Sequence, residues 1–142
     1  MTAQRIDQGM AVAAARALPE TVDKELRTRY RQLRAMLHRA GLAPTYAFIA
    51  AKAKDKDEDA GPGQDKLIQA YRDAARAIRV RVFGGDLRRK PETMTAREVL
   101  TELGKMSPAQ YARASAEAAA FVGWLSRLAD ACVQGGQGGD DA

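Results

Sequence analysis

Apolar residues recur every three to four positions along most of the chain, which is the period of an α-helix. Runs in which apolar and polar residues alternate one by one, as in a half-buried strand, are missing. Ala, Leu, Arg, Glu and Gln, which favour helices, dominate the chain, whereas β-branched residues are sparse. We therefore predict an all-α fold, a single compact bundle of about six helices with a long C-terminal helix.

Stop signals and capping residues set the bounds of the expected helices. Pro19 ends the first helix and Gly41 ends the second, while Thr95 and Glu98 form a capping box for a short fifth helix. The expected helices cover residues 3–18, 22–40, a segment from Pro44, 65–83, a segment after Thr95, and a segment from Ser107. The residues expected to face the core on the second, third and fourth of them are Leu26, Tyr30, Leu33 and Leu37; Tyr46, Ile49 and Ala53; and Leu67, Tyr71, Ala74, Ile78 and Val82.

The last expected helix is apolar on nearly all sides. Its core stripe consists of Tyr111, Ala114, Ala118, Phe121, Leu125 and Leu128, and much of the opposite side is occupied by Ala116, Ala120, Gly123 and Trp124. Two interpretations stay open. The helix is either central and surrounded by its neighbours, or it presents Trp124 and the small residues beside it as an interface for another subunit.

Length and composition indicate one domain. The 142 residues are 46% hydrophobic and 29% charged, and we expect a helical bundle domain over residues 1–133 followed by a disordered Gly/Asp tail over residues 134–142. The polar segments 53–65 and 84–95 are predicted to be loops. No apolar run reaches the ~18 residues of a membrane span, so we expect a cytoplasmic protein without membrane contact.

The positive charge is concentrated in two segments. The net charge is +5, yet residues 22–40 carry six Lys or Arg against two acids and residues 66–90 carry eight against two, so these segments together hold +10. Such concentration indicates a polyanionic partner.

Arginines within these segments share one spacing. Arg27, Arg31 and Arg34 fall at i, i+4 and i+7, and the same interval separates Arg72, Arg76 and Arg79, which places each set on one helix face. A solvated face is the ordinary alternative, but such a face carries acids three or four residues away, and only Asp23 is well placed near the first stripe.

A row of arginines suits a phosphate backbone, because each guanidinium can donate two hydrogen bonds to phosphate oxygens. Tyr30, Tyr46, Tyr71 and Phe121 fall on apolar faces. We therefore expect contact with phosphates, without sequence preference, to outweigh stacking on bases.

Catalytic chemistry has little support in the sequence. His38 is the only histidine and Cys132 the only cysteine, so neither an intramolecular disulfide nor a thiol and imidazole zinc site can form. Glu-x-x-His pairs and glycine-rich nucleotide fingerprints are missing. We expect no catalytic residue, no metal, no cofactor and no small-molecule substrate.

Three segments in order resemble one family. "RIDQGMAVAAARAL" at the start, "GLAPTYAFIAAKA" over residues 41–53 and "YARASAEAAAFVGWLSRLADA" over residues 111–131 resemble the small all-helical subunit of type III-B (Cmr) CRISPR-Cas effector complexes. The most specific elements are Gly41-Leu42 with Phe48, Ile49 and Lys52, and Glu117, Ala120, Trp124, Leu125, Arg127 and Ala129.

The resemblance implies a noncatalytic subunit that stacks on copies of itself, beside the Cmr subunits that bear the crRNA, and lines the channel for target RNA. Target RNA and crRNA are therefore expected partners. It makes Lys52 and Arg127 candidates for RNA contact, in addition to the two arginine stripes. Two alternatives stay open. The chain could be a protein scaffold in which the first stripe pairs with acids of a neighbouring subunit, or a free-standing helical protein that binds nucleic acid nonspecifically.

Overall fold

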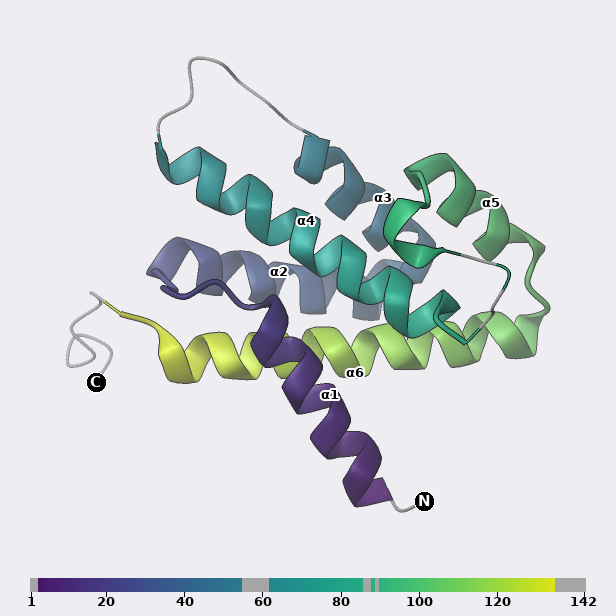
Figure 1. Cartoon of the computed structure of the whole chain (residues 1–142), viewed down its shortest axis with the longest axis horizontal. Coiled ribbons are helices and arrows are strands. Elements are labelled where there is room, and N and C mark those ends of the chain that lie inside the picture. The colour runs from purple at the N-terminus through teal and green to yellow at the C-terminus, as the bar shows by residue number, and fades with distance from the viewer. Residues whose placement is uncertain (1–2, 55–61, 86–87, 89, 135–142) are drawn as a thin grey trace.

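The computed structural model describes residues 3–54, 62–85, 88 and 90–134. Within these ranges the chain forms α1 (Ala3–Ala17), α2 (Lys24–Ala40), α3 (Leu42–Lys54), α4 (Pro62–Phe83), the 3-10 helix η1 (Pro91–Thr93), α5 (Ala96–Lys105) and α6 (Pro108–Cys132), as Figure 1 shows. The predicted all-α bundle with a long last helix is confirmed. Most of the predicted loop over 53–65 and nearly all of the predicted tail over 134–142 lie outside the described residues.

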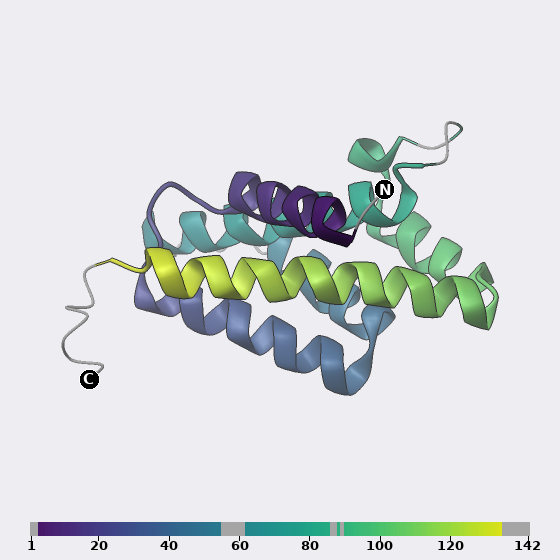
Figure 2. The same ribbon diagram turned by 90° about the horizontal axis from the view of Figure 1, so that it is seen from below.

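Helix α6 is the central element of the bundle. It contacts α1, α2, α3 and α4, and Figure 2 shows it running the length of the molecule between α1 and α2. Five of its residues without exposed surface fall on one helix face, at i, i+3, i+4, i+7 and i+11: Ala118, Phe121, Val122, Leu125 and Ala129. The interpretation of a central helix is therefore confirmed for this face, while Ala116, Ala119 and Ala120 on its other side are exposed.

The predicted core stripes of α2 and α3 are confirmed. All seven of their residues are buried, and on α4 the middle residues Tyr71, Ala74 and Ile78 are buried while Leu67 and Val82 near its ends are half-buried. Helices α3 and α4 meet through an edge-to-face contact between Phe48 and Tyr71, with ring centroids 6.2 Å apart. Regular helical spacing was thus a sufficient guide to which side of each helix packs inward.

Side-chain caps begin three of the helices. The Asp23 carboxylate accepts a hydrogen bond from the Leu26 N–H at 2.8 Å at the start of α2. Thr95 and Glu98 form the predicted capping box of α5, with bonds of 2.8 and 3.1 Å. Ser107 and Gln110 form a second box at α6, with bonds of 2.9 and 3.1 Å. These local bonds fix where each helix starts, because they satisfy N–H groups without a partner inside the helix.

A sharp turn at Gly41 joins α2 to α3. Gly41 has a φ of +93°, a conformation that glycine adopts without the steric cost of a Cβ, and its N–H donates to the Leu37 carbonyl at 3.0 Å. The Ala43 N–H then donates to the Tyr111 hydroxyl of α6 at 2.9 Å. Helix α3 therefore begins at Leu42, two residues before the predicted start at Pro44.

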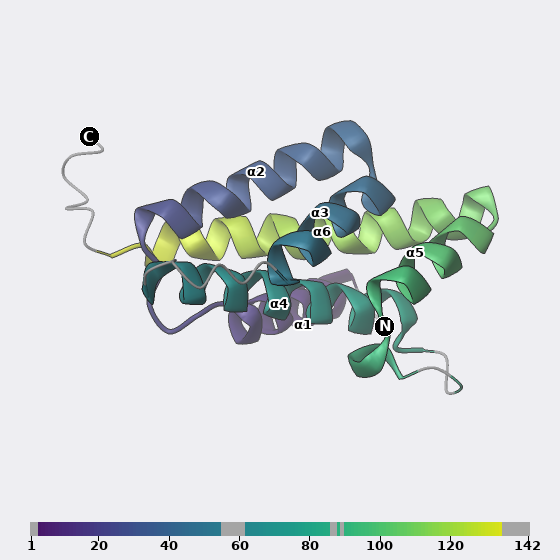
Figure 3. The same cartoon turned by 90° about the horizontal axis from the view of Figure 1, so that it is seen from above.

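The end of α6 is tied to the connection between α1 and α2. The Gln134 N–H donates to the Val22 carbonyl at 2.8 Å, and Val22 and Val133 form an isolated parallel bridge. Figure 3 shows α2 and α6 side by side and running in opposite directions. The hydrogen bond and the bridge hold the start of α2 beside the end of α6, and so fix how the two helices lie along each other.

Candidate nucleic-acid interface

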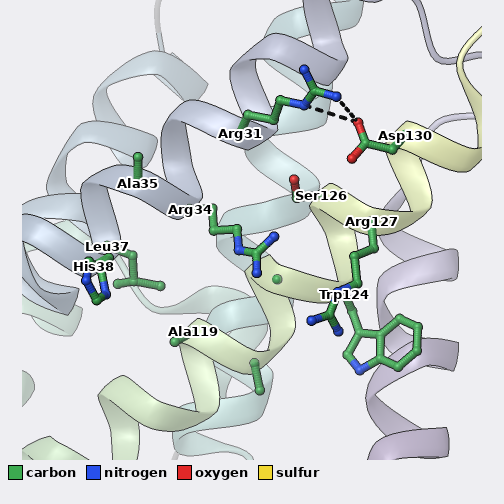
Figure 4. Close-up of a pocket in the computed structure, with 12 residues that line it drawn as sticks. Arg31, Arg34, Ala35, Leu37, His38, Ala119, Trp124, Ser126, Arg127 and Asp130 are labelled. Carbon is green, nitrogen blue, oxygen red and sulfur yellow. Dashed lines mark hydrogen bonds and ion pairs between the residues drawn. The ribbon is translucent and has the colours of Figure 1, made fainter.

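A groove lies between α2 and α6, with a volume of about 790 Å³. Its α2 wall is formed by Arg31, Arg34, Ala35, Leu37 and His38, and its α6 wall by Ala119, Ala120, Gly123, Trp124, Ser126, Arg127 and Asp130. Figure 4 shows these side chains. The groove thus brings part of the first arginine stripe together with most of the predicted subunit interface.

Small residues on α6 leave room for this groove. Ala119 and Ala120 are exposed, and a Cβ added at Gly123 would meet no atom within 4 Å. Two helices packed through large side chains would fill such a space. Here the α2 wall supplies long arginines, and Ala119, Ala120 and Gly123 of the α6 wall supply almost no bulk, so the α2 arginines face an open floor.

One arginine of the groove is paired across it. Arg31 donates to the Asp130 carboxylate through Nε at 3.1 Å and Nη2 at 2.7 Å. Both side chains remain about half exposed, at 54% and 43%, so we expect this pair to contribute only about 0–1 kcal/mol to stability. The partner is 99 residues away in the sequence, which explains why spacing within α2 did not reveal it.

Arg34 and Arg127 approach the groove from opposite walls. Figure 4 shows Arg34 reaching from α2 over the floor, with Arg127 and Trp124 on the α6 side. The Arg127 guanidinium carbon lies 5.7 Å from the centroid of the Trp124 ring. Within the described part of the chain Arg34 has neither a hydrogen bond nor an ion pair. With Asp130 counted against the three arginines, the groove lining is positive.

The second stripe lies elsewhere and is engaged by neighbouring elements. Arg72 donates to the Ala53 carbonyl at 3.1 Å, and Arg76 Nη2 lies 3.6 Å from the Glu92 carboxylate. Arg79 donates to the Pro91 carbonyl at 2.6 Å and to the Tyr46 hydroxyl at 3.0 Å. These arginines line a separate cavity between α3, α4 and α5, with a volume of about 730 Å³, that shares no residue with the α2–α6 groove.

Arg79→Ala should destabilise the fold by about 1–3 kcal/mol, because it leaves the Pro91 carbonyl and the Tyr46 hydroxyl without their donor. Arg76→Ala is the matched control on the same helix. It removes an exposed pair and should change stability by no more than about 0.5 kcal/mol. Urea unfolding of both variants measures the difference, and equal stabilities would contradict a structural role for Arg79.

The remaining predicted residues lie outside the groove. Arg27 is half-buried on α2 and takes part in an interaction within the chain. Lys52, also half-buried, lies on α3 with its ammonium 5.7 Å from the centroid of the Phe48 ring. Ala116 is exposed on α6 but does not line the groove. Of the predicted RNA contacts, Arg31, Arg34 and Arg127 therefore share the α2–α6 groove.

Sequence reasoning missed Asp130 and Ala119 of the groove, while it assigned Ala120 to the subunit interface. Asp130 follows Arg127 by three residues and Gly123 by seven, which places the three on one side of α6. That spacing could have marked a polar stripe on the last helix. Spacing along α6 does not indicate that the stripe faces α2, because the pairing of helices is a tertiary property.

Two features are absent from the described residues. Within them, no group of three or more His, Cys, Asp or Glu could hold a metal ion. Over the same residues, none of the helices combines the length and apolarity that crossing a bilayer requires. Burial is the main cause that raises the pKa of Tyr30 and of Tyr71, so both phenols stay protonated at neutral pH.

Comparison with known proteins adds one finding. No curated protein and no solved structure gives a significant match. The sequence model of the family described as CRISPR-associated protein (Cas_Cmr5) matches residues 3–132, which run from the first residue of α1 to the last residue of α6. The match therefore includes both walls of the groove. The chain belongs to the CRISPR-associated protein (Cas_Cmr5) family and is a Cmr5-type subunit of the type III-B CRISPR-Cas complex.

Proposed function

We propose that this subunit is noncatalytic and holds the phosphate backbone of target RNA, or of the crRNA:target duplex, in the groove between α2 and α6. The observation that carries the proposal is the placement of Arg34 and Arg127 on opposite walls of one open, positively charged groove. Guanidinium groups facing each other across a groove can bind phosphate oxygens from both sides. The groove therefore offers a path for a strand.

Phosphate contact without base readout suits an RNA-guided complex. In such complexes the pairing of guide and target reads the sequence, and protein surfaces hold the backbone. A subunit that recognised particular bases would restrict which targets the complex accepts. Sequence-independent contact by arginines fits this division of work.

Arg31 can join the site only when its guanidinium exchanges the Asp130 carboxylate for a phosphate. Its guanidinium is bonded to Asp130, but the pair is exposed and weak, so a phosphate can compete with the carboxylate. Arg72, Arg76 and Arg79 have partners within the protein, and the proposal does not rely on them. Arg27 and Lys52 remain predictions outside the groove.

A second candidate function is stacking on copies of the same subunit through α6. It is favoured by the exposed small residues Ala116, Ala119 and Ala120, which would let another helix approach closely. The two functions are compatible if the neighbour covers the Ala116 end of this surface. In a pure scaffold, Arg31 and Arg34 would instead pair with acids of the neighbouring subunit and no RNA would be bound.

The isolated chain should bind unrelated single-stranded RNAs weakly and with equal affinity. Each phosphate neutralised by an arginine lowers the slope of log affinity against log salt by about 0.7. Titration of several unrelated RNAs at two salt concentrations measures both properties. A strong preference for one sequence at equal salt would contradict phosphate tracking, and tight binding at physiological salt would favour a free-standing nucleic-acid-binding protein.

A further inference from the structure

The groove contains an aromatic side chain that sequence reasoning assigned only to the subunit interface. Tyr30, Tyr46, Tyr71 and Phe121 are buried, as their apolar faces predicted. Trp124 is half-buried and lines the groove. The Arg127 guanidinium lies over its ring, and Figure 4 shows both side chains on the α6 side of the groove. An indole and two guanidinium groups thus line one groove.

We propose that Trp124 and Arg127 form a stacking subsite for one unpaired nucleobase, while Arg34 binds a phosphate next to that base. The inference rests on the proposed function, because it assumes that the groove takes RNA, and it adds a preference for single-stranded over double-stranded RNA. In a duplex the base faces are covered by neighbouring bases, so the subsite would stay empty.

The chemistry of the three side chains matches one nucleotide. Proteins that bind unpaired RNA stack its bases on aromatic rings and on the planes of Arg guanidinium groups. Such stacking tolerates any sequence, because every base has a π-face. The subsite therefore keeps the sequence independence that the proposed function requires, while it adds affinity that phosphate contacts alone do not give.

The space in the groove also fits. Its volume of about 790 Å³ lies within the range of roughly 300–1,000 Å³ that holds small ligands. The floor is lined by Ala119, Ala120 and Gly123, and open space lies where a Gly123 side chain would be. A flat base can therefore approach α6 without displacing a large side chain.

Trp124 is the only tryptophan of the chain, so its fluorescence reports on this position alone. The full chain is titrated with a single-stranded RNA, with an RNA duplex of the same length, and with inorganic polyphosphate, which has no bases. We expect the single strand to quench Trp124 emission by about half or more, and the other two to bind with little quenching. Single-strand binding without quenching beyond that of polyphosphate overturns the stacking subsite and leaves phosphate binding intact.

Two variants give an independent readout. Trp124→Leu should weaken single-strand binding roughly fivefold or more and leave polyphosphate binding unchanged, and Trp124→Phe should keep most of the single-strand affinity. Equal single-strand affinity of the unmodified chain, Trp124→Leu and Trp124→Phe overturns the proposal. If Trp124→Leu then fails to join the complex while it binds RNA normally, Trp124 is an assembly contact instead. If Trp124→Leu does not fold, quenching of the unmodified chain decides. If the chain binds neither the single-stranded RNA, nor the duplex, nor polyphosphate, the proposed function itself is contradicted.

Discussion

Leu33→Ala should destabilise the protein by about 2–5 kcal/mol, because it removes a buried side chain and leaves a cavity. Leu33 is 1% exposed and lies in the middle of the core stripe of α2. Its neighbours on that stripe, Tyr30 and Leu37, are held by the same helix and cannot move in to fill the space without shifting α2 against α6. A loss of this size is a large part of the ~5–15 kcal/mol that stabilises a typical domain.

The control for Leu33→Ala is Arg31→Ala, two residues away on the exposed side of α2. It removes a half-exposed ion pair and should cost no more than about 1 kcal/mol. Thermal or urea unfolding of the two variants gives the comparison. A larger loss at Arg31 than at Leu33 would mean that α2 presents a different face to the core.

The double variant Arg34→Glu/Arg127→Glu should weaken binding of single-stranded RNA by roughly 50- to 100-fold at about 50 mM salt. The estimate follows from counterion release. Each lost phosphate contact makes the slope of log affinity against log salt less negative by about 0.7, and the double variant loses two contacts. The salt dependence of the residual binding should fall accordingly. Fluorescence anisotropy of a labelled RNA at several salt concentrations measures both effects.

Arg76→Glu/Arg97→Glu is the matched control, because it changes the net charge by the same amount. Arg76 is 61% exposed on α4, Arg97 is exposed on α5, and neither lines the α2–α6 groove. This variant should keep RNA affinity within a few fold of the unmodified chain. Equal losses in both double variants would mean that RNA responds to the total charge and not to the groove.

Helices and their inward faces could be predicted from the sequence, because both follow from local regularities. The spacing of Leu26, Tyr30, Leu33 and Leu37 identified the buried side of α2. The capping residues Thr95 and Glu98 identified the start of α5. In each case the pattern lies within a single helix, so one short stretch of the sequence contains every residue that defines it.

The composition of the site depended on contacts between distant residues and could be predicted only in part. Arg31 and Arg79 belong to stripes with the same spacing, yet Arg31 faces α6 and Arg79 bonds to η1 and to Tyr46 of α3. The spacing fixes which residues share a helix face, but the packing of helices decides what that face meets. The short helix η1, within a segment predicted to be a loop, is part of that packing.

Crosslinking of target RNA to this subunit in the assembled complex tests the central claim most directly. RNA with a photoactivatable nucleotide is loaded into the complex, and the crosslinked peptides are identified by mass spectrometry. The α2–α6 groove predicts crosslinks to the segment of α2 around Arg34 and to the segment of α6 from Trp124 to Arg127. The claim would be contradicted if target RNA crosslinked only to other subunits, and if the two segments crosslinked to neighbouring proteins and not to RNA.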